Sequence, residues 1–183
     1  MSAMRLAWVP LCLSLAIGSA AAQPKADIDR WFSDLAKAES AETAKPIEDK
    51  IEGAFRQSGS PSLDLLLSRA KEAVAGGDSK TAATLAGTLN KLAPNFAEGW
   101  RLRATLDAAA GNDSAAMVAL QRVVTLNPRH FSAMADLAGM LEDYGDKKAA
   151  LALYRKVLTL DPHHEGAGSR VRELERAVEG QGI

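Results

Sequence analysis

Residues 131–164, FSAMADLAGMLEDYGDKKAALALYRKVLTLDPHH, are the stretch that decides the fold. Their landmarks recur upstream at a spacing of 34 residues. The recurring residues are three prolines, three glycines that precede Asp or Asn, and two sets of alanines: Pro94, Pro128 and Pro162; Gly77, Gly111 and Gly145; Ala70, Ala104 and Ala138; Ala82, Ala116 and Ala150. A fixed period of this length is typical of a stacked array of helix pairs.

The periodic region, residues 61–164, divides into three copies, 63–96, 97–130 and 131–164. Each copy holds two helical stretches with a Gly-Asp or Gly-Asn turn between them. Glycine adopts the left-handed backbone that ends a helix, and Asp or Asn caps the start of the next one. The proline ends the second helix and begins the first turn of its successor. The alanines are predicted to pack where helices cross closely, because a larger side chain would overpack the seam.

These copies resemble tetratricopeptide repeats, whose consensus is Trp-x2-Leu-Gly-x2-Tyr, then Ala-x3-Phe, then Pro. The third copy matches at Met134, Leu137, Ala138, Leu141, Ala150, Tyr154, Val157 and Pro162; the second at Trp100, Ala104, Ala116, Leu120, Val123 and Pro128; the first at Leu66, Ala70, Ala73, Ala82, Ala86, Leu89 and Pro94. The resemblance implies an all-α, right-handed α-solenoid of antiparallel helix pairs.

Two flanking segments are expected to complete the array. Residues 23–60 are predicted to form an N-terminal helix pair, a degenerate repeat that precedes the first copy. Within it Trp31 lies on the apolar stripe, and we expect the neighbouring Phe32 to be displaced outward. Residues 165–183 are predicted to form a capping helix and a tail, since the end of a stack needs a polar outer face.

The first 22 residues have the pattern of a secretory signal. Arg5 precedes an apolar stretch, residues 6–17, and small residues lead to Ala22. This order predicts cleavage near Ala22 and a periplasmic or secreted protein. The alternative is an uncleaved anchor, although the apolar stretch is shorter than the roughly 20 residues that span a bilayer. Cys12 lies in this segment, so the mature chain would form no disulfide and offer no thiolate to a metal.

Composition and motifs narrow the class of function. Lys and Arg total 22 against 23 for Asp and Glu, without the basic face that nucleic acid requires. We find no catalytic constellation, phosphate-binding loop or metal motif, and we expect no enzyme activity, no small-molecule substrate and no cofactor. The histidines allow two interpretations. They are structural residues of the turns, or the chain is a metal-handling or enzyme-accessory protein that uses His130, His163 and His164.

The resemblance also implies a partner-binding site, because the first helix of each repeat forms the concave face. Transferred to this chain, the face comprises Asp64, Leu67, Lys71 and Val74; Glu98, Arg101, Thr105 and Ala108; Ser132, Ala135, Gly139 and Glu142. Its mixed character suits an extended peptide or an amphipathic helix. The carboxylate clamp of some family members is matched only by Lys71 and Arg101.

Arg69 and Arg103 stand where the consensus has leucine. Either their stems pack while the charges reach solvent, or they form a basic ladder for a carboxylate-bearing partner. The resemblance implies a non-catalytic protein-interaction scaffold that serves envelope or cytochrome assembly, with a membrane-associated complex among its expected partners. A third hypothesis is self-assembly, in which the N-terminal helix pair exchanges between chains.

Overall fold

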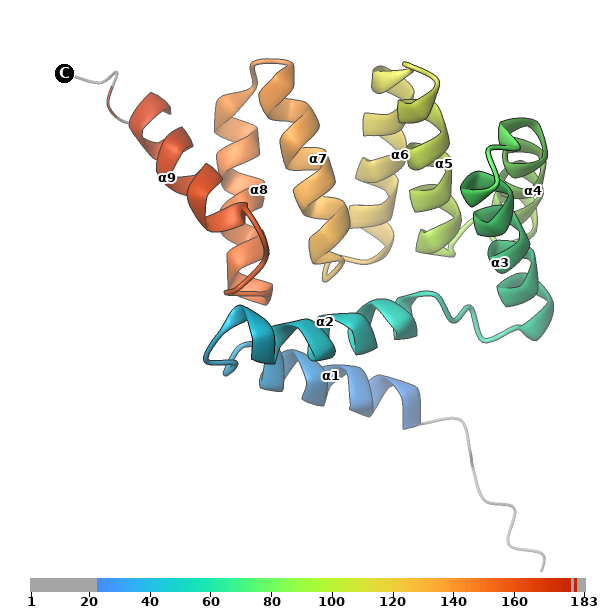
Figure 1. Ribbon diagram of the computed structural model, residues 1–183, viewed down its shortest axis with the longest axis horizontal. Coiled ribbons are helices and arrows are strands. Elements are labelled where there is room, and N and C mark those ends of the chain that lie inside the picture. The colour runs from blue at the N-terminus through green and yellow to red at the C-terminus, as the bar shows by residue number, and fades with distance from the viewer. Residues whose placement is uncertain (1–22, 179, 181–183) are drawn as a thin grey trace, which may run out of the picture.

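The computed structural model describes residues 23–178 and residue 180, and within them it contains nine helices and no strand. Figure 1 shows the helices, which confirm the predicted all-α solenoid. Their bounds are α1 (Gln23–Leu35), α2 (Ala41–Phe55), α3 (Pro61–Ala75), α4 (Ser79–Leu92), α5 (Ala97–Ala109), α6 (Asp113–Leu126), α7 (Phe131–Asp143), α8 (Lys147–Leu160) and α9 (Ala167–Val178). The predicted signal, residues 1–22, lies outside the described residues.

Turn chemistry separates the two helices of each repeat. Gly77, Gly111 and Gly145 have φ values of 77°, 73° and 87°, the left-handed conformation that glycine adopts without strain. The next helix is then capped by an acidic side chain in two of the three repeats. The Asp78 carboxylate accepts a hydrogen bond from the Thr81 amide, and Asp146 accepts one from the Ala149 amide, both at 3.0 Å.

The six helices from α3 to α8 pack as three consecutive pairs, α3 with α4, α5 with α6 and α7 with α8. The six periodic alanines are at most 3% exposed, as expected for residues that pack between helices. At the C-terminal end α9 packs on α8 through Val171 and Leu174, which are buried, and closes the stack.

The N-terminal helix pair does not stack on the first copy as a degenerate repeat would (Figure 1), which corrects our expectation. α1 and α2 form a hairpin, residues 23–55, that lies across the ends of the other helices, on the side of the turns between repeats (Figure 1). We call this the N-terminal hairpin and residues 61–178 the array. The segment between them contains Gly59 at φ 82°, which redirects the chain before α3.

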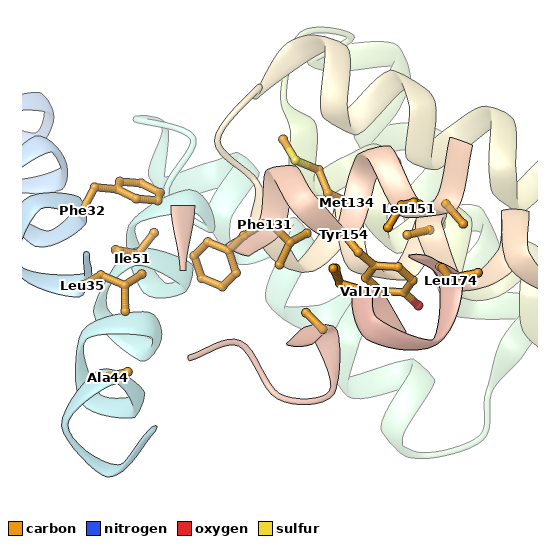
Figure 2. Close-up of a cluster of buried hydrophobic side chains, with 14 residues drawn as sticks. Phe32, Leu35, Ala44, Ile51, Phe131, Met134, Leu151, Tyr154, Val171 and Leu174 are labelled. Atoms are coloured by element: carbon orange, nitrogen blue, oxygen red, sulfur yellow. The ribbon is translucent and has the colours of Figure 1, made fainter. Parts of the chain in front are cut away.

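Phe32 decides where the N-terminal hairpin sits. We expected this side chain to point outward, but it is 6% exposed and lies in one core cluster with Phe131 of α7 (Figure 2). The two rings meet edge to face with centroids 6.2 Å apart, and the Arg129 guanidinium stacks 3.8 Å from the Phe32 centroid. An inward orientation removes the large apolar ring of Phe32 from water, whereas an outward orientation would leave the ring exposed. The inward orientation is therefore favoured.

Among the described residues, no helix has the combination of length and apolar character needed to span a bilayer.

Candidate partner-binding groove

Three adjoining hollows follow the first helices of the repeats. Their volumes are about 390, 300 and 340 Å³ from α3 through α5 to α7. Lys71 lines both the first and the second hollow, and Arg101 and Thr105 line both the second and the third. Because neighbouring hollows share these residues, they form one groove. Its lining beyond these three comprises Arg56, Asp64, Leu67, Ser68, Glu72, Val74, Ala75, Leu102, Ala104, Ala108, Leu120, Asp136 and Met140, with Glu98 in the floor.

The first two copies supply the groove with the residues that the resemblance implied. Two of them have structural duties as well. Leu67 is 2% exposed and belongs to the core between α3, α4 and α5. The Asp64 carboxylate accepts a hydrogen bond from the Ser58 amide at 2.7 Å, which fixes the entry into α3.

The third copy departs from the implied lining. Asp136 and Met140 of α7 line the hollow there. Ser132 instead donates a hydrogen bond to Glu52 of α2, and Glu142 pairs with Arg170 of α9 at 3.0 Å. Ala135 packs toward the core cluster shared with the N-terminal hairpin, and Gly139 lies near the Tyr154 hydroxyl.

A buried ion network forms the floor of the groove. Glu98 is 1% exposed and His130 is fully buried, with 2.8 Å between Oε1 and Nε2. His130 Nδ1 accepts from the Ala133 amide, so Nε2 carries the proton and donates to Glu98. Lys71 Nζ lies 3.9 Å from the other Glu98 oxygen. Burial raises the pKa of Glu98, but the hydrogen bond from His130 and the nearby charges of Arg101 and Lys71 outweigh it, and the net pKa lies below the ordinary value.

α2 reaches this network through Glu52. One Glu52 oxygen lies 3.3 Å from Arg101 Nη1, and the other accepts from Ser132 Oγ and lies 3.8 Å from His130 Nδ1. Arg101 also approaches Asp136 at 3.8 Å. We call Arg101, Ser132 and His130 the Glu52 cradle, because Arg101 and Ser132 bind the two carboxylate oxygens and the His130 ring lies beside them.

Lys71 is more exposed than Arg101 in the groove, with side chains 43% and 27% exposed. Burial of part of this side chain lowers the pKa of Lys71, while the nearby Glu98 carboxylate opposes the effect.

The three histidines do not form one metal site. His163 Nε2 donates to the Ala38 carbonyl oxygen at 2.7 Å, and the His164 ring meets Phe131 edge to face. Within the described part of the chain, the group that could surround an ion is Glu52, Glu98 and His130, whose ligand atoms lie within 4.8 Å of one another. Both ring nitrogens of His130 are already engaged, and cationic side chains pair with both carboxylates.

Comparison with known proteins agrees with the repeat geometry. No protein-family model matches the chain. A TPR repeat-containing protein of Rhizobium etli is 30% identical over 128 residues, which are 70% of this chain and 63% of that protein. The chain is a tetratricopeptide repeat protein. It spans a little under two thirds of that relative's length.

Solved tetratricopeptide structures share the fold. The first such domain of Spaghetti, bound to an HSP90 peptide, superposes with a TM-score of 0.58 at 17% identity, over 64% of this chain and 93% of the other. The Sgt2 domain of Aspergillus fumigatus gives 0.58 at 21% identity, over 67% and 82%. MamA gives 0.58 at 22% identity, over 76% and 84%.

Arg69 and Arg103 lie on exposed surfaces of this tetratricopeptide array and are not among the residues that line the groove. Arg103 Nε donates to Asp107 Oδ2 at 2.7 Å, one turn later on α5. Its charge is therefore paired on its own helix, as expected for a stem that packs while the guanidinium reaches the surface.

Several residues of the groove and of the ion network beneath it were not predicted from the sequence, among them Asp136, Met140 and Glu52. Asp136 and Met140 stand 35 residues after Arg101 and Thr105, not 34. A shift of one residue rotates the exposed face of a helix by about 100°. The repeat period contains no sign of this rotation. Glu52 carries no local signal at all, because its partners are 49 and 80 residues away.

Proposed function

We propose that this tetratricopeptide repeat protein is a non-catalytic scaffold that binds a peptide or an amphipathic helix of a partner protein in its groove. The observation that carries the proposal is the continuity of the hollows from α3 to α7. Apolar side chains such as Val74 and Met140 alternate there with charged ones such as Lys71 and Arg101. A mixed lining of this kind suits a helix or strand that carries both kinds of side chain.

The character of the buried network also supports a binding role. Glu98 and His130 are the residues best suited by type to acid–base chemistry, yet each is saturated by partners within the chain. Both are inaccessible to a substrate in the groove. Their geometry serves to hold α3, α5 and α7 together beneath the site.

The groove can be tested with a single substitution on its wall. Ala108 is exposed, lines the hollow between α5 and α7, and contributes to no ion pair of the groove. We expect Ala108→Trp to fill the hollow and to weaken, by about tenfold or more, the binding of peptides selected from a random library on the purified chain. Ala152→Trp, at an exposed position of α8, is the matched control and should bind these peptides as the unsubstituted chain does. Equal binding by both variants would exclude the groove as the site.

We further propose that the protein works in the bacterial periplasm, in envelope or cytochrome assembly, with a membrane-associated complex as its partner. The order of basic, apolar and small residues in positions 1–22 supports export. Cell fractionation with N-terminal sequencing tests this step. We expect a periplasmic chain that begins at Gln23, and a membrane-bound chain that retains residues 1–22 would show an anchor instead.

A further inference from the structure

The N-terminal hairpin is attached to the array by side chains. Among the described residues, the hydrogen bonds that cross from hairpin to array all involve at least one side chain. The other contacts include the buried side chains of Phe32, Leu35, Ala44 and Ile51, which share a core cluster with Phe131, the Phe55 ring against His130, and the ion pair of Asp29 with Arg129. Such an interface can open without breaking any helix.

A hinge lies at the end of the hairpin. Arg56 and Gln57 are exposed, whereas Ser58 is bound to Asp64 and stays with α3. Rotation at these two residues would move α1 and α2 together and leave the start of α3 in place. A Cβ added at Gly59 would meet no atom within 4 Å, so the segment is sterically open.

The hairpin covers a site that recognises a carboxylate. Glu52 fills the cradle of Arg101, Ser132 and His130, and the Phe55 ring lies 4.9 Å from the His130 ring. Glu52 and Phe55 are three residues apart and therefore share one face of α2. A helix that carries a carboxylate and an aromatic ring at this spacing reproduces everything that α2 presents to the cradle.

We propose that the N-terminal hairpin is a displaceable cover, and that the partner's helix competes with α2 for the Glu52 cradle through a carboxylate and an aromatic ring three positions later. The proposal rests on the proposed function of the groove and adds the chemistry of its occupant. Arg101 joins the two sites, since it binds Glu52 and also lines the hollows between α3, α5 and α7. A helix that enters along the groove therefore meets Glu52 at Arg101.

A synthetic peptide with the sequence of residues 40–58 supplies the competing helix. It is titrated against the full chain and against Phe32→Ala, which removes an anchor of the hairpin outside the cradle. This variant should raise the open fraction about a hundredfold and should therefore tighten the apparent peptide affinity by about a hundredfold. Asp29→Ala, which loses only the ion pair with Arg129, is a milder opening variant and should give a smaller gain in the same direction. A peptide with Glu52→Gln should bind about tenfold more weakly to each chain.

Hydrogen exchange provides the second readout. Amides of residues 28–55 should exchange faster than those of α5 to α8, and saturating peptide should accelerate them further. Peptide binding that leaves hairpin exchange unchanged, or equal affinities for both chains and both peptides, overturns the proposal. Dimers with exchanged hairpins in place of peptide complexes also overturn it. The scaffold function fails separately: if Ala108→Trp leaves library peptides bound while the 40–58 peptide still opens the hairpin, only the groove assignment is lost.

Discussion

Replacing Asp161 by asparagine should stabilise the protein at neutral pH. Asp161 caps the C-terminus of α8 and is fully buried, with Oδ1 accepting from the His163 amide at 3.2 Å. Its Oδ2 is buried without a hydrogen bond in the described part of the chain. A negative charge is unfavourable at a helix C-terminus. Burial raises the pKa of Asp161, opposed by the nearby His164, and burial also raises the pKa of Glu48, with the Asp161 charge adding to it.

The magnitude follows from these contacts. Asparagine keeps the Oδ1 acceptor, removes the buried charge and offers an amide to Glu48. We expect a gain of about 1–2 kcal/mol at pH 7, or about 4 °C in Tm. A carboxyl with a raised folded-state pKa stabilises the protein most below its unfolded pKa, and that contribution is lost as the pH rises through the folded value. The advantage of Asp161→Asn should therefore shrink as the pH falls from 7 towards 4.

Urea unfolding at several pH values between 4 and 7 measures this difference. Asn127 occupies the equivalent place one repeat earlier, where its Oδ1 accepts from the Arg129 amide at 3.1 Å. Asn127→Asp is therefore the matched control and should lose stability at pH 7. A destabilised Asp161→Asn, or a gain that does not change with pH, would refute the reasoning.

Three further outcomes can be measured on the same protein. Ala138→Leu should overpack the seam and cost about 2 kcal/mol in urea unfolding, whereas exposed Ala152→Leu should change it by less than about 0.5 kcal/mol. Glu98→Ala should cost about 2 kcal/mol at pH 7, because the buried Nε2–H of His130 loses its acceptor. Since the pKa of Glu98 is lowered, its contribution is present above the unfolded pKa and fades as the pH falls through the folded value. Phe32→Ala should cost about 3 kcal/mol of hairpin docking, seen as a shift of Trp31 fluorescence with little loss of far-UV helicity.

The repeat register was readable from the sequence because its determinants are local. Prolines, turn glycines and capping residues determine the backbone conformation of residues only a few positions away. The periodic alanines pack against adjacent helices. Trp100 illustrates this. It stands at the consensus tryptophan position, and its indole Nε1 donates to the Pro94 carbonyl oxygen at 2.9 Å, only six residues away.

The position of the N-terminal hairpin was not readable from the sequence. An amphipathic helix pair shows the same periodicity whether it stacks as a repeat or crosses the ends of other helices. Phe32 was expected outside for this reason, because its partner Phe131 is 99 residues away. On α3 and α5 the residues implied by the resemblance line the hollows, whereas on α7 the lining residues are displaced by one position, where α7 also packs against α8 and the hairpin.

The long sequence separations of the hairpin contacts order the folding of the chain. Each helix pair of the array closes through neighbours and can form early, because local contacts cost little loop entropy. The hairpin is synthesised before the array, yet its contacts reach Arg101, Phe131 and finally His163, which bonds to Ala38 across 125 positions. The hairpin is thus made before the array and docks after it. Until it docks, the apolar side chains of Phe32 and Leu35 remain exposed to water and accessible to chaperones.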